Sequence, residues 1–117
     1  MLLPFVIAAA TPLDMFDAAL DVHIQCAFAV SRLDHGRGGS TAAFAASLTR
    51  MCGAEERALR DASAALAISR GMSSAQARAL AEARREDGRA DMIANYDDIP
   101  RVERILRKAE RHLPEPD

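Results

Sequence analysis

Hydrophobic residues recur at helical spacing along most of the chain, and no segment alternates apolar and polar residues as a half-buried strand does. Four segments carry the helical pattern. Their expected bounds are 12 to 34, Ser40 or Thr41 to about Arg70, a start at Ser73 or Ser74, and 100 to about 113. The pattern predicts an all-α protein, a small four-helix and mostly antiparallel bundle.

Capping residues and glycines set the expected helix ends. Thr11 is suited to cap the first helix, with Pro12 at its first position, and Gly36 and Gly71 are suited to end the first and second helices. Gly53 lies inside the second segment, where it costs about 1 kcal/mol relative to alanine. We expect one helix there, kinked or weakened near Gly53.

The first helix is apolar over more than half of its circumference. Its polar stripe is narrow and consists of Asp14, Asp21, Gln25 and Arg32. One apolar side carries Leu13, Phe16, Leu20, Ile24 and Ala27, and the other carries Met15, Val22, Cys26, Ala29 and Leu33. A helix of this kind is buried on several sides, so we expect it to be central in the bundle or to form a dimer interface.

The composition predicts one modest core. Of 117 residues, 50% are hydrophobic but only 4% are aromatic, and alanine contributes much of the hydrophobic fraction. The third helix has an alanine face, which favours close but weak packing; its members are Ala79, Ala83, Ala90 and Ala94. We expect a single helical domain at 11–113 and a frayed tail at 114–117.

Residues 1–10 form a short apolar run that ends in three alanines and is followed by Thr11. The run fits a secretory signal cleaved after Ala10, although it lacks a basic start and is shorter than usual. It equally fits an apolar tail that packs on the bundle. Both interpretations stay open, and with them a periplasmic or secreted and a cytoplasmic location. The run is too short to span a bilayer, so no transmembrane segment is expected.

Cys26 and Cys52 lie on the apolar sides of the first two helices, nine positions before and twelve after the loop at 35–40. An antiparallel hairpin would bring them to similar heights, which favours a disulfide if the protein is exported. In a reducing compartment they are small core residues. His23 lies three residues from Cys26, and two side chains at that spacing can bind the same metal ion. A structural zinc site, however, needs four ligands. A core histidine bonded to a neighbour is the favoured interpretation, and no metal site is assigned.

The last helix carries a basic patch, a candidate surface for an anionic partner. Its members are Arg101, Arg104, Arg107, Lys108 and Arg111. The favoured interpretation is nevertheless a solvated face whose apolar side closes the bundle. The formal net charge of −2 argues against a general nucleic-acid binder, and no aromatic residue is interleaved for base stacking.

No arrangement of catalytic residues and no cofactor motif stands out. The glycine-rich loop at 35–40 lacks the Lys-Ser/Thr of a phosphate-binding loop, and Tyr96, Asp97 and Asp98 fit a turn capped by Asp98 better than a cation site. The leading hypothesis is a non-enzymatic helical binding or interaction protein, with a protein partner or self-association through the first helix and with export to a periplasm left open. The alternative is a small cytosolic nucleic-acid-binding regulator that uses the basic last helix. A metal-dependent enzyme around His23 and Cys26 is a third, weaker hypothesis.

Overall fold

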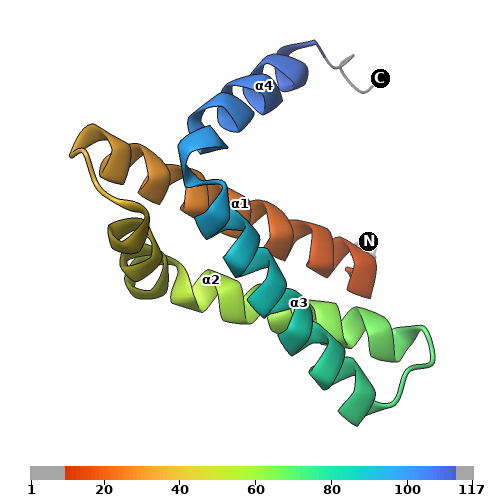
Figure 1. Ribbon diagram of the computed structural model, residues 1–117. Coiled ribbons are helices and arrows are strands. Elements are labelled where there is room, and N and C mark those ends of the chain that lie inside the picture. Colours follow the sequence, from red (N-terminus) through yellow and green to blue (C-terminus); the bar gives the residue numbers. More distant parts are fainter. Residues whose placement is uncertain (1–9, 113–117) are drawn as a thin grey trace, which may run out of the picture.

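The computed structural model describes residues 10–112, which form four α-helices and no strand (Figure 1). The helices are α1 (Pro12–Gly36), α2 (Thr41–Ser69), α3 (Ser74–Ala94) and α4 (Ile99–Arg111), with a short 3-10 turn, η1 (Tyr96–Asp98), before α4. The all-α fold with four helices is therefore confirmed. The interpretations of residues 1–10 and of the tail at 114–117 fall outside the described residues, apart from Ala10.

Side-chain caps start the first three helices where the sequence predicts. The Thr11 hydroxyl accepts a hydrogen bond from the Asp14 N–H at 3.1 Å, and the Asp14 carboxylate accepts one from the Thr11 N–H at 3.2 Å. Ser40 and Ser73 each accept from the N–H three residues further on. These contacts satisfy backbone donors that the first helical turn leaves free. Asp98, by contrast, makes no capping hydrogen bond for α4, contrary to our expectation.

The helix ends that were predicted agree with the structure to within two residues. Helix α1 ends at Gly36, two residues beyond the expected bound of 34, and the left-handed residue after it is Gly38, with φ of +66°. The turn that follows is closed by the Gly39 N–H, which donates to the carbonyl of Asp34 at 2.6 Å. Gly71, after α2, has the expected positive φ of +97°. Helix α2 is continuous through Gly53.

Helix α2 packs against both α1 and α3, and α1 packs against both α2 and α4 (Figure 1). Helix α2 runs opposite to α1 where they meet, since Cys26 contacts Cys52 and Asp34 contacts Ser47. The first helix therefore has two neighbouring helices, as α2 does, and its burial in the bundle or in a dimer interface stays a prediction.

The main core lies where α1, α2 and η1 meet. Its buried members are Ala27, Phe28, Val30, Phe44, Leu48, Cys52, Tyr96 and Ile99. Tyr96 stacks on Phe44 with ring centroids 4.6 Å apart, and its hydroxyl donates to the carbonyl of Gly39 at 3.1 Å. The single tyrosine thus joins the η1 turn to the α1–α2 loop.

Between α2 and α3 the core is small and consists of Ala64, Ala77 and Ala81. The alanine face predicted for the third helix is wrong, since Ala79, Ala83, Ala90 and Ala94 are exposed. The helix is turned instead so that Arg85 and Arg89 reach Glu56 on α2. Buried ion pairing, which a hydrophobic pattern does not report, sets the orientation of α3.

Helix α4 extends away from the other three helices (Figure 1). Only Ile99 and Glu103 are buried in it, whereas Val102, Ile105 and Leu106 are 41%, 56% and 44% exposed. The expectation that its apolar side closes the bundle is therefore wrong. The Glu103 carboxylate is instead the group that faces the bundle, because it pairs with Arg32 at the end of α1.

Candidate functional site

The second apolar side predicted for α1 lies on the surface. Met15, Val22 and Leu33 are 58%, 54% and 50% exposed. With the smaller residues between them they follow alternating steps of four and three, the spacing by which a helix pairs with another helix. We call this line the α1 seam; it consists of Met15, Ala19, Val22, Cys26, Ala29 and Leu33.

Helix α2 widens the apolar surface beside the seam. A shallow groove between the two helices is lined by Ala18, Ala19, Val22, Ala54, Glu55 and Ala58. Met51 of α2, 44% exposed, lies next to Cys26, whose sulfur is 3.5 Å from the Met51 carbonyl oxygen. The small side chains leave room for another helix to approach both backbones closely.

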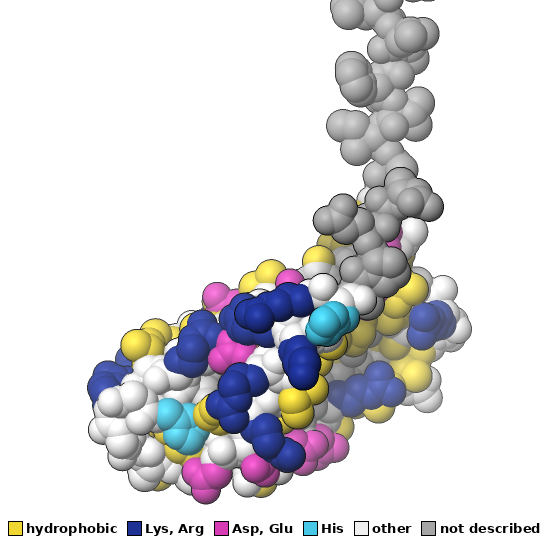
Figure 2. Space-filling model, turned by 90° about the horizontal axis from the view of Figure 1, so that it is seen from above, with side chains coloured by type: hydrophobic (Ala, Val, Ile, Leu, Met, Phe, Trp, Pro, Cys, Tyr) yellow, Lys and Arg dark blue, Asp and Glu magenta, His cyan; other side chains and the backbone are white. Residues whose placement is uncertain are grey.

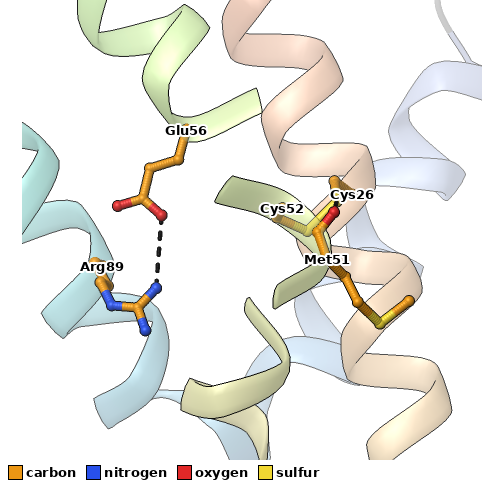
Figure 3. The surroundings of a disulfide bond; sticks show 5 residues. All are labelled: Cys26, Met51, Cys52, Glu56 and Arg89. Atoms are coloured by element: carbon orange, nitrogen blue, oxygen red, sulfur yellow. Dashed lines mark hydrogen bonds and ion pairs between the residues drawn. A yellow bond between two sulfur atoms is a disulfide. The ribbon is translucent and has the colours of Figure 1, made fainter. Parts of the chain in front are cut away.

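The Cys26–Cys52 disulfide fixes α1 to α2 beneath this surface (Figure 3). Its Cα atoms are 5.9 Å apart, within the range that a disulfide requires, and Cys52 is fully buried. Because the Cys26 sulfur is bonded, it is not a thiolate that could share a metal with His23. No group of three metal-binding side chains lies together within residues 10–112. The disulfide thus removes the thiolate that the hypothesis of a shared metal at His23 and Cys26 required.

The basic patch predicted on the last helix is exposed. Arg107 pairs with Glu103 at 2.7 Å, but the other members make no ion pair with any described residue; they are Arg101, Arg104, Lys108 and Arg111. Lys and Arg side chains gather beside hydrophobic ones on the face shown in Figure 2. Helix α4 therefore combines an unpartnered apolar face with an unpartnered basic face.

The N-terminal half of α1 has the opposite charge. Between residues 11 and 31 the only charged side chains are the carboxylates of Asp14, Asp17 and Asp21. All three are exposed and lie on the outer side of α1, beside the seam. The protein thus carries one acidic and one basic helix surface, each next to uncovered apolar residues.

A charge network between α2 and α3 is the feature that the sequence analysis missed. Glu56, 8% exposed, pairs with Arg85 at 2.7 Å and with Arg89 at 3.5 Å (the latter pair is drawn in Figure 3). Arg85 also donates to Glu82, and that hydrogen bond lowers the pKa of Glu82 and raises the pKa of Arg85. The helical spacing of Glu82 and Arg85 was the available signal, but the contact of Arg85 with Glu56 spans 29 positions.

His23 lies at this network yet has an unsatisfied nitrogen. The residue is 7% exposed, and its Nδ1 has no hydrogen-bond partner among the described residues. Burial lowers its pKa, and the negative charges of Glu56 and Glu55 oppose that effect only in part. The expectation of a core histidine bonded to a neighbour is half correct: His23 is buried, but its Nδ1 has no partner among the described residues.

Comparison with known proteins identifies no relative: no protein family, no curated protein and no solved structure matches the chain. Within residues 10–112, no helix has both the length and the apolar content to cross a membrane. The surfaces of the chain itself must therefore suggest the function.

Proposed function

We propose that this chain is a non-enzymatic interaction protein of an oxidising compartment that acts as a symmetric pair of copies joined through the α1 seam. The exposed seam is the observation that carries the proposal. A run of large apolar side chains at 50% to 58% exposure is costly to leave in water, and a second copy is the occupant that its pattern fits best.

The seam is complementary to itself when two α1 helices run in opposite directions. Centred on residue 24, that arrangement places Met15 against Leu33 of the second copy and Ala19 against Ala29 of the second copy. Large residues then meet at both ends and small residues near the middle. A two-fold pair of this kind buries the same patch on both copies and closes without further growth.

The charges favour the same arrangement. Helix α4 is held to the C-terminal end of α1 by the Arg32–Glu103 ion pair. In an antiparallel pair that end lies beside the N-terminal half of the other α1. The basic face of α4 therefore approaches the three carboxylates of the second copy. The exposed apolar residues of α4 can then pack against that copy.

Light scattering coupled to size exclusion tests this proposal on the full, disulfide-bonded chain. We expect the wild type to be a dimer and Val22→Glu to be a monomer with unchanged circular dichroism. Ile68→Glu is the matched control, because Ile68 is a helical residue 43% exposed that lies outside the seam, and it should leave the dimer intact. Higher salt should weaken the dimer, because exposed charges are screened. A wild type that stays monomeric at high concentration, or that binds anionic vesicles instead, would contradict the proposal.

The compartment has its own test. Disulfides persist in oxidising compartments, and an apolar run precedes Thr11 in the sequence. Intact mass should be measured on protein from its native host, alkylated with and without prior reduction. We expect a chain that starts at Thr11 and is alkylated only after reduction. A chain that retains Met1 and has two free thiols would place the protein in a reducing compartment.

One observation favours the alternative, nucleic-acid binding through α4: four of its basic side chains have no partner in the described part of the chain. This alternative requires binding to DNA or RNA that weakens steeply with salt. It also requires that replacing Arg104, Arg107 and Arg111 by alanine abolishes that binding. Unchanged binding after those substitutions would exclude it.

A further inference from the structure

A second recessed surface lies on the side of α1 that faces α3, away from the α1 seam. It is a groove of about 240 Å³ to which α1, α2 and α3 all contribute. Its apolar wall is formed by Phe16, Leu20, Leu59 and Met92. We propose that this groove binds a medium-chain carboxylate, with its head group on Arg84 and its chain running along the apolar wall towards His23.

The charges around the groove select an anion. Four arginines line it, namely Arg60, Arg84, Arg85 and Arg89. Three of these are engaged by carboxylates of the protein, whereas Arg84 makes no ion pair with any described residue. A guanidinium that is free to form two parallel hydrogen bonds is well suited to bind a carboxylate in a bidentate manner.

The positions of the two polar groups set the length of the ligand. Arg84 and Phe16 also line the neighbouring groove, so they mark one end. His23 lies seven residues beyond Phe16 on α1, which is about 10 Å at 1.5 Å per residue. The volume of about 240 Å³ holds roughly eight water-sized groups at about 30 Å³ each. An acyl chain of medium length satisfies both limits.

His23 is the independent sign that the groove has an occupant. Its imidazole is more than nine-tenths buried, lines the groove and has an unpartnered nitrogen. A buried polar atom without a partner destabilises a fold unless a ligand or water satisfies it. The Nδ1 atom is itself covered by the protein, so the ring must turn before a ligand can reach it. A neutral imidazole can then donate or accept a hydrogen bond, and a terminal hydroxyl on the chain should improve binding.

The test is calorimetric titration of the full, disulfide-bonded protein with decanoate, 10-hydroxydecanoate and decanol, below the concentrations at which they form micelles. We expect decanoate to bind, the hydroxylated acid to bind more tightly, and decanol to bind at least tenfold more weakly than decanoate. Failure of decanoate to bind, or equal binding of decanol, would overturn the proposal.

Three variants locate the site. Arg84→Gln should weaken decanoate binding about tenfold, whereas Arg78→Gln, on an exposed part of the same helix, should not change it. Gly88→Leu should abolish binding, because Gly88 lines the groove and has open space where its side chain would grow. This variant should remain folded, since leucine is the better helix former. Binding insensitive to both Arg84→Gln and Gly88→Leu would show that the acid lies elsewhere.

Nuclear magnetic resonance of the His23 ring supplies a readout independent of affinity. Decanoate should shift the His23 imidazole resonances in the wild type and leave those of His112, at the far end of α4, unchanged. A His23 ring that does not respond at saturating decanoate would contradict the placement. Because Val22→Glu removes the dimer without touching this groove, decanoate binding in that monomer separates the two proposals.

Discussion

Removing the Cys26–Cys52 disulfide should cost this small domain a large part of its stability. The bond joins residues 26 positions apart and closes a loop that contains the turn between α1 and α2. For a loop of that length, the loop-closure entropy lost from the unfolded chain corresponds to about 3.5 kcal/mol at 25 °C. Cys52 is fully buried beside Phe44 and Leu48, so replacement by alanine leaves the core apolar and adds only a small packing loss.

The assay is chemical and thermal unfolding of the oxidised wild type and of the double variant Cys26→Ala, Cys52→Ala. Both should carry Val22→Glu, so that dissociation of a dimer does not enter the measured free energy. The double variant should lose about 3.5 kcal/mol and roughly 15 °C in Tm. Reduced protein with both cysteines present is the control and should unfold like the double variant. If oxidised and double-variant proteins differ by less than about 1 kcal/mol, the loop-closure reasoning fails here.

Three further substitutions probe the fold. Tyr96→Phe should lower the free energy of unfolding by about 1 kcal/mol, because it removes the hydrogen bond to Gly39 but keeps the ring stacking; urea unfolding checks this, and unchanged stability would mean that the bond contributes nothing. Gly53→Ala should raise stability by about 1 kcal/mol, because the residue is mid-helix and a new methyl group meets only a flexible guanidinium at 3.2 Å; a loss of stability would refute this. The folded-state pKa of His23 is lowered below 6.5. The unfolded chain therefore binds its proton more readily, and stability should fall as the pH drops below 6.5. Replacing His23 by leucine should reduce that dependence, and an unaltered profile would show that other groups cause it.

The local features of this fold were accessible from the sequence. Three helix starts follow from capping by Thr11, Ser40 and Ser73, because a cap is a contact between residues three apart. Gly71 ends α2 for an equally local reason, since its positive φ is one that glycine adopts without strain. A short loop between two antiparallel helices places Cys26 and Cys52 at similar positions along the helix axes, so their pairing could also be predicted from the sequence.

The candidate surfaces were only partly predictable. Hydrophobic spacing showed that α1 has two apolar sides, and the charge pattern showed that α4 is basic. Neither pattern shows which side another helix covers, because that depends on where the chain turns at η1 and on the Arg32–Glu103 contact across 71 positions. The groove at His23 was missed for the same reason, since its walls come from three helices.

The sequence by itself determined the number of helices, most of their bounds, and the basic character of the last helix, since capping, glycine geometry and helical periodicity act over a few residues. Only the tertiary structure decided that α2 packs against both α1 and α3, that α4 extends into solvent, and that Arg85 and Arg89 turn inward to Glu56. These outcomes depend on pairs of groups far apart in the chain. Whether such a pair forms depends on the free energy of burying a charge with its partner relative to leaving it in water. No single segment of the sequence specifies that difference.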